Sequence, residues 1–152
     1  MPSPHSKNPE VRLRDILENI QAIREFTAGM DSDQLAADRR TLYAVIRALE
    51  IISEATRRLP TEYKDRHAKI DWVAIAAAGN IYRHEYEGVD EKLIWHTIQH
   101  DLAPLEAVVN SELEFAAEAG RQGLAVASSE HAKEEQDFID SISDWPEKPP
   151  SR

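Results

Sequence analysis

The stretch DRRTLYAVIRALEIISEA, residues 38–55, decides the fold. Its apolar residues recur every three to four positions, which is the period of an amphipathic α-helix. Asp38 can cap the first turn, and Arg57 and Arg58 stand in the last turn before Pro60, where positive charge suits the carbonyl end of a helix. The stretch therefore predicts a long helix between Asp38 and Pro60 that buries Leu42, Val45, Ile46, Leu49, Ile52 and Ala55.

Similar patterns lie on both sides of this helix. Before it, Asn8-Pro9 is a typical start and Gly29 a typical stop, so a first helix is expected between them. After it, Asp71 and Asp90 are expected to cap a third and a fourth helix. Short helical connectors are expected within residues 30–37 and 61–69. Because short loops join long amphipathic helices, the sequence predicts an all-α, up-down four-helix bundle over residues 8–120.

Two features interrupt the later part of this pattern. The third helix is expected to run to about Tyr86, and the fourth should kink near Pro104, where a backbone hydrogen bond is lost, and end by Gly120. Residues 121–152 contain an acidic stretch, followed by a segment rich in proline. We expect this tail to be poorly packed, either disordered or forming one short helix.

Composition excludes several classes of protein. The chain has 152 residues, a formal charge of −10 and no cysteine, which excludes thiolate metal sites and thiol nucleophiles. No apolar run approaches the roughly 18 residues of a membrane span, so a cytoplasmic protein is expected. The acidic balance argues against broad nucleic-acid binding. The tail, residues 116–152, carries 4 Lys and Arg against 8 Asp and Glu, so part of that excess lies outside the bundle.

Polar and reactive side chains are densest in the segment GNIYRHEY, residues 79–86. On a helix, Asn80 and His84 are one turn apart and share a face. His84 titrates near neutral pH and could act as a general acid or base, although a histidine in a bundle is more often structural. Gly79 is unfavourable inside a helix by roughly 1 kcal/mol, which indicates the close approach of another helix or of a partner subunit, or a plain packing glycine.

Two other groups of residues could form a metal site or a phosphate site. His96 and His100 have a spacing compatible with a shared metal ion, but they lack the inner Glu of a metalloprotease motif, so an ordinary solvated face is the simpler interpretation. Arg40, Arg47 and Arg83 would form a local phosphate site if they faced one cleft. The simpler interpretation of the arginines is surface pairing with Asp38, Glu50 and Glu54.

Taken in order, several segments resemble the HepT-like family of HEPN-domain proteins. They are residues 14–20, 38–55, 71–76, 83–86 with 88–90, and 94–102. The resemblance covers about residues 12–110 and leaves out the tail.

The resemblance implies a helical bundle that forms a homodimer, with the motif helices of two protomers lining one cleft. Its members are ribonuclease toxins of toxin–antitoxin systems, paired with a nucleotidyltransferase antitoxin. Cleavage of RNA is metal-independent, so no cofactor is implied. In the family's Arg-x4-His motif, His84 matches the catalytic histidine, Asn80 the polar residue after the arginine, and Tyr86 the tyrosine that the antitoxin modifies with AMP.

The motif arginine itself is replaced by Gly79. A cation is expected to stabilise the charge that develops on the phosphate during cleavage, and glycine cannot supply it. Arg83 and Arg47 are the candidates for a relocated cation. The alternative is a catalytically degenerate module that binds a nucleotidyltransferase without nuclease activity.

Overall fold

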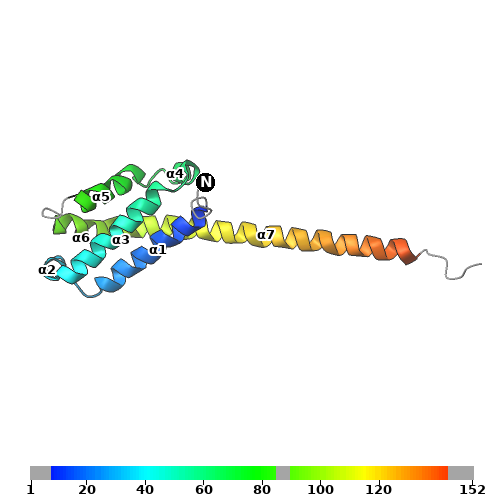
Figure 1. The fold of residues 1–152 in the computed structure, drawn as a ribbon, viewed down its shortest axis with the longest axis horizontal. Coiled ribbons are helices and arrows are strands. Elements are labelled where there is room, and N and C mark those ends of the chain that lie inside the picture. Colours follow the sequence, from blue (N-terminus) through cyan, green and yellow to red (C-terminus); the bar gives the residue numbers. More distant parts are fainter. Residues whose placement is uncertain (1–7, 85–89, 144–152) are drawn as a thin grey trace, which may run out of the picture. The chain divides into compact units, whose positions relative to one another are not determined.

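The computed structural model describes residues 8–84 and 90–143; within 81–84 and 141–143 only the backbone is described. These residues form seven helices and contain no strand (Figure 1). The helices are α1 (Pro9–Phe26), α2 (Ser32–Ala37), α3 (Arg39–Arg57), α4 (Thr61–Arg66), α5 (Trp72–His84), α6 (Glu91–His100) and α7 (Leu102–Ser143).

The helix starts predicted from single residues are confirmed. The side chains of Asn8, Asp38 and Asp90 each accept a hydrogen bond from a backbone N–H in the first turn of α1, α3 and α6. Asp71 does the same for α5, since its carboxylate accepts a bond from the N–H of Ala74 at 3.0 Å. After α1, Gly29 has a φ of 73°, a left-handed conformation that glycine adopts at little cost.

One hydrophobic core holds residues 8–84 and 90–114 together as a helical bundle. The long helix α3 packs against α1 on one side and α5 on the other, and α6 with the first turns of α7 completes the layer (Figure 1). The all-α bundle predicted from the sequence is confirmed. Its buried apolar residues are Leu13, Ile16, Ile20, Ile23, Leu35, Val45, Ala48, Leu49, Ile52, Ala55, Leu59, Ile94, Leu102, Leu105 and Val109.

The predicted fourth helix is two helices divided at Asp101. Pro104 has no N–H to donate to the carbonyl of His100, and its ring would clash with that carbonyl in a continuous helix. The chain therefore ends α6 at His100 and starts α7 at Leu102, which puts Pro104 in a first turn, where its missing N–H costs little. The break precedes the proline rather than falling at it as a kink.

Helix α7 runs to Ser143, well beyond the end expected at Gly120. A Cβ atom added to Gly120 or Gly123 would meet nothing within 4 Å, so neither glycine serves a close contact with the described residues. The glycines lower the stability of the helix, and six alanines between positions 116 and 132 oppose this effect, since alanine has the highest helix propensity. The chain divides into two units, residues 1–114 and residues 115–152. The second unit is helical over its described part, and its side chains from 117 to 140 are exposed.

No helix in the described ranges is long and apolar enough to cross a lipid bilayer.

A buried carboxylate links α4 to α7. Glu112, 7 % exposed, accepts two hydrogen bonds from Arg66, at 3.0 and 2.8 Å, and lies 2.6 Å from the imidazole of His67. The hydrogen bonds from Arg66, followed by that from His67, lower the pKa of Glu112 below its ordinary value against the opposing effect of burial. The cluster fixes the short α4 segment, and so the path that the chain takes into α5.

Replacing Glu112 by glutamine should lower the free energy of unfolding at pH 7 by about 2 kcal/mol, between the values for a surface and a buried ion pair, since Arg66 is half exposed. Urea denaturation measures this loss. Because the folded-state pKa of Glu112 is lowered, its contribution is present above the unfolded-state value near 4.5 and is lost as the pH falls below it. The difference between the wild type and Glu112→Gln should therefore shrink on acidification below about pH 4.5.

Glu114→Gln is the matched control, because it removes the same charge from an exposed position one half-turn further along α7. It should change the stability by less than about 0.5 kcal/mol. Equal losses in the two variants would show that Glu112 acts only through net charge.

Candidate functional site

The helix that carries the candidate site, α5, is held at its start by Trp72. The indole N–H of Trp72 donates to the backbone carbonyls of Lys64 and His67, at 3.1 and 3.0 Å. This partly buried anchor fixes where α5 begins relative to α4. From there the helix continues to His84 and runs antiparallel to α3 (Figure 1).

A second anchor lies at the crossing of α3 and α5. The hydroxyl of Ser53, on α3, donates to the carbonyl of Ala76 at 2.9 Å and accepts a hydrogen bond from the N–H of Gly79 at 3.1 Å. Ser53 is 1 % exposed and Gly79 is buried. The close approach that Gly79 predicts is thus found within the chain, between α3 and α5, where small residues let the two backbones come near.

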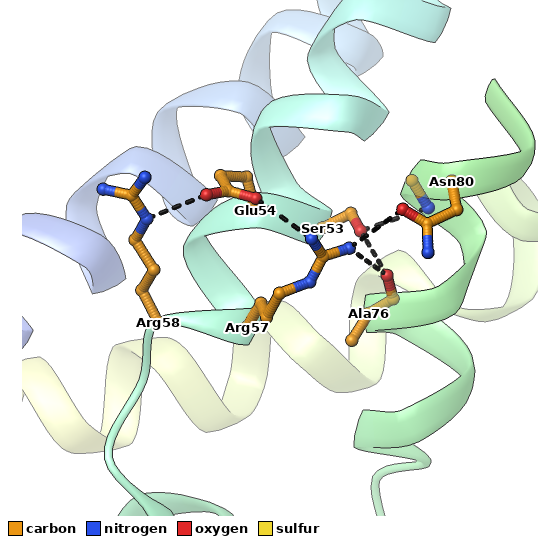
Figure 2. A network of polar contacts seen from close by, with 7 residues as sticks. Ser53, Glu54, Arg57, Arg58, Ala76 and Asn80 are labelled. Atoms are coloured by element: carbon orange, nitrogen blue, oxygen red, sulfur yellow. Dashed lines mark hydrogen bonds and ion pairs between the residues drawn. The ribbon is translucent and has the colours of Figure 1, made fainter. Parts of the chain in front are cut away.

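One turn further along α3, Arg57 reaches across to the same part of α5. Its Nη2 donates to the carbonyl of Ala76 at 2.9 Å and to the side-chain oxygen of Asn80 at 3.4 Å, and its Nη1 lies 3.5 Å from Glu54 (Figure 2). The Arg57 side chain is 40 % exposed. The guanidinium is therefore held beside Asn80 while part of it faces solvent.

The neighbouring Arg58 points away from α5. Its Nε donates to the other oxygen of Glu54 at 2.8 Å, so one carboxylate lies between two guanidinium groups (Figure 2). The surface pairing predicted for the arginines is confirmed for Glu54, and also for Glu50, which lies 3.1 Å from Arg47. Two positive charges and one negative charge leave the carboxyl end of α3 with a local charge of +1.

The structure brings the predicted site residues together only in part. Asn80 is exposed on α5 and contacts Arg57. His84 is the last residue of α5, one turn after Asn80. The side chains of His84 and Arg83 lie outside the described residues, as does the whole of Tyr86.

Arg47 is placed away from Asn80. It lies ten residues before Arg57 on the same helix, which corresponds to about 15 Å along the axis. Its side chain is 72 % exposed and paired with Glu50. Among the described side chains, the arginine that contacts Asn80 is Arg57, which the sequence places only in the last turn of α3.

A signal for Arg57 was nevertheless present in the sequence. Gly79 and Ser53 are small residues on neighbouring helices, and such residues mark where two helices can cross closely. An arginine one turn beyond the crossing point is long enough to reach the partner helix. Combining the two observations would have pointed to Arg57.

The imidazole rings of His96 and His100 lie with their centroids 4.4 Å apart and their planes tilted by 46°. In the part of the chain that the structure describes, no group of three or more His, Cys, Asp or Glu side chains is arranged to hold a metal ion.

The other prominent feature of the bundle is an apolar hollow of about 620 Å³. Residues of α3, α5, α6 and the first turn of α7 line it, among them Leu49, Ala74, Ala77, Leu93 and Leu105. Of these lining residues, Leu93 is 50 % exposed, and Val73, which precedes Ala74 in α5, is 80 % exposed.

Comparison with known proteins identifies the family of the chain. The model of the ribonuclease HepT-like family matches residues 16–112, which is well over half of the chain and agrees with the range expected from the sequence. The chain belongs to the ribonuclease HepT-like family. The resemblance noted from the sequence motifs is confirmed by this match.

Relatives of the chain carry names in agreement with the family. A protein of the archaeon Thermococcus cleftensis named "Probable ribonuclease HepT" is 39 % identical over 94 residues, covering 62 % of this chain and 86 % of its own length. A candidate RNase of Caldanaerobacter subterraneus is 34 % identical over 108 residues, covering 71 % of this chain and 96 % of its own length. A candidate RNase of Methanocaldococcus jannaschii is 32 % identical over 107 residues, covering 68 % of this chain and 88 % of its own length. No solved structure matches this HepT-like chain.

The Ser53 hydroxyl should contribute to the stability of the HepT-like bundle through its two contacts with α5. Ser53→Ala removes both hydrogen bonds and should lower the free energy of unfolding by about 1 kcal/mol, as measured by urea denaturation.

Thr56→Val is the matched control on the same helix. Thr56 is fully buried, and its hydroxyl has no hydrogen-bond partner among the described residues, so replacing that hydroxyl with a methyl group should be neutral or stabilising. A loss in Thr56→Val as large as that in Ser53→Ala would refute the role of the Ser53 hydrogen bonds.

Proposed function

We propose that the chain is a metal-independent RNA endonuclease, the toxin of a toxin–antitoxin pair, with its site in the cleft of a homodimer. One observation carries the proposal: the exposed face of α5 joins an apolar half to a polar half. Val73, Ala77, Asn80 and His84 stand at helical spacings of four, three and four residues, so these four positions share one face of α5. Val73, Ala77 and Asn80 are exposed.

In this proposal His84 moves protons while RNA supplies its own nucleophile. The 2′-oxygen of the ribose attacks the adjacent phosphorus, its proton passes to a base, and the bond to the 5′-oxygen breaks as that oxygen takes up a proton. The products are a 2′,3′-cyclic phosphate and a 5′-hydroxyl. His84 is suited to either transfer because imidazole titrates near neutral pH. Asn80, one turn away, would hold a phosphate oxygen or orient the imidazole.

In the proposed homodimer, the second protomer packs against the apolar half of the α5 face. Ala74, Ala77 and the half-exposed Leu93 line the apolar hollow, and Val73, the residue before Ala74, is 80 % exposed. These small side chains allow a helix of another protomer to approach closely. Because the apolar surface continues into the Asn80 and His84 positions along one face, pairing there would bring two copies of the polar end into one cleft.

We further propose that the toxin is neutralised by a nucleotidyltransferase antitoxin that transfers AMP from ATP to the hydroxyl of Tyr86 and releases pyrophosphate. The family resemblance at residues 83–86 supports this assignment. A phosphodiester placed two residues after His84 would add negative charge next to the proposed catalytic residue and so repel the RNA backbone.

Gly79 favours a second candidate function. In this alternative, the loss of the motif arginine at position 79 abolishes nuclease activity. The chain then acts as a module that keeps the bundle and binds a nucleotidyltransferase. A nuclease assay separates the two candidates.

The purified protein should cleave RNA in the presence of EDTA, and His84→Ala should slow cleavage by about 100-fold or more, since it removes the general acid or base. Gel analysis of a fluorescent RNA oligonucleotide and of its terminal groups measures both rate and product chemistry. His96→Ala is the control, because it removes a histidine from α6, outside the proposed site. A wild-type protein that leaves RNA intact would favour the inactive module.

The dimer should depend on the apolar half of the α5 face. Val73→Glu places a charge where the second copy is expected and should shift the protein from dimer to monomer, as measured by light scattering coupled to size-exclusion chromatography. Val11→Glu is the control, because Val11 is an exposed valine on α1. A wild-type monomer, or a Val73→Glu variant that stays dimeric, would contradict this assignment.

A further inference from the structure

The HepT-like chain lacks a cation at the motif position and holds one beside it. In phosphodiester cleavage, negative charge builds up on the phosphate oxygens, and a fixed positive group next to them lowers the barrier. Position 79 of α5 is glycine, but Arg57 of α3 contacts Ala76 and Asn80, three residues before that position and one after it (Figure 2).

We propose that Arg57 is a phosphate ligand of the RNA site and supplies from α3 the positive charge that position 79 of α5 lacks. The proposal rests on the proposed ribonuclease function and assigns to that site a residue from another helix.

Arg57 is positioned before any RNA binds. The carbonyl of Ala76 and the amide oxygen of Asn80 both accept from Nη2, and Glu54 lies near Nη1. Three contacts on two helices fix the plane of the guanidinium, so little side-chain freedom is lost when a phosphate binds.

Arg57 also keeps capacity for a ligand. Its Nε donates no hydrogen bond to the described residues, and 40 % of the side chain is exposed. A guanidinium has five N–H donors in a planar fork that matches two phosphate oxygens. Among the described side chains, Glu54 is the carboxylate paired with Arg57, and it also accepts from Arg58 at a shorter distance, 2.8 Å against 3.5 Å. The negative charge next to Arg57 is therefore shared.

Other arginines of the bundle are less well placed. Arg47 is about 15 Å away along α3 and is paired with Glu50. Arg66 is committed to Glu112 through two hydrogen bonds. Arg83 stays a candidate from the sequence, and it would act together with Arg57 rather than in place of it.

The test compares Arg57→Ala with Arg58→Ala. The two variants remove the same charge from adjacent residues that share Glu54, but only Arg57 contacts Asn80. Binding is measured by fluorescence anisotropy with a 2′-O-methyl RNA oligonucleotide, which cannot be cleaved because its 2′-oxygen is blocked. Cleavage is measured in parallel with unmodified RNA, and folding by thermal unfolding followed by circular dichroism.

Arg57→Ala should weaken RNA binding about tenfold and reduce the slope of log affinity against log salt by about 1, because one phosphate contact is lost. It should also lower the cleavage rate at saturating RNA about 100-fold. Arg58→Ala should weaken either quantity by only about threefold, because it removes a charge that does not contact Asn80 and its sole effect on Arg57 is to leave Glu54 to that residue. Arg57→Lys should recover part of the binding, since it keeps the charge without the fork. If Arg57→Ala fails to fold, Arg57→Gln keeps much of the side chain and removes the charge.

Equal losses in Arg57→Ala and Arg58→Ala would overturn the proposal, because they would indicate a general effect of charge. No RNA binding by the wild type would overturn it as well. Binding that depends on Arg57, in a wild type that cleaves no RNA, would refute the nuclease function while supporting Arg57 as the phosphate ligand.

Discussion

Ser53 touches the backbone of α5 twice, at the carbonyl of Ala76 and at the N–H of Gly79, and these contacts set the distance between the two central helices. A hydroxyl can make both contacts only where neither helix interposes a large side chain. The crossing point in turn decides which residues of α3 can reach α5. Arg57, one turn beyond Ser53, is close enough to do so.

Net charge is a poor guide to a site of this size. The chain has a formal charge of −10, which argues against broad binding to nucleic acid. At the carboxyl end of α3, however, Arg57 and Arg58 outnumber Glu54, and the field near a phosphate depends on the nearest charges. Salt screens distant surface charge over about 10 Å and leaves such a close contact largely intact. An acidic protein can therefore carry a local anion site.

The fold was predictable from the sequence where signals are local. Caps at Asn8, Asp38, Asp71 and Asp90 act within one turn, so the starts of four helices could be located without tertiary information. The division of the fourth helix at Asp101 was harder to place, because Pro104 acts on the carbonyl four residues earlier. The length of α7 is not predicted correctly, because two glycines and an acidic composition argue for an end of the helix near Gly120. The six alanines between positions 116 and 132 favour its continuation. Arg57 was missed for a different reason: its contacts join residues 19 and 23 positions apart, which helix periodicity does not relate.

The glycine at position 79 and the arginine at position 57 are best understood as parts of one arrangement. A glycine inside α5 costs roughly 1 kcal/mol of helix stability, and the hydrogen bond from its N–H to Ser53 offsets a similar amount. A large side chain at position 79 would have to displace α3 from this buried contact. The close packing at position 79 of α5, which leaves no cation there, is what brings the end of α3 near enough to offer one. Electrostatic stabilisation depends on where a charge lies relative to the phosphate, and the helix that carries it is immaterial.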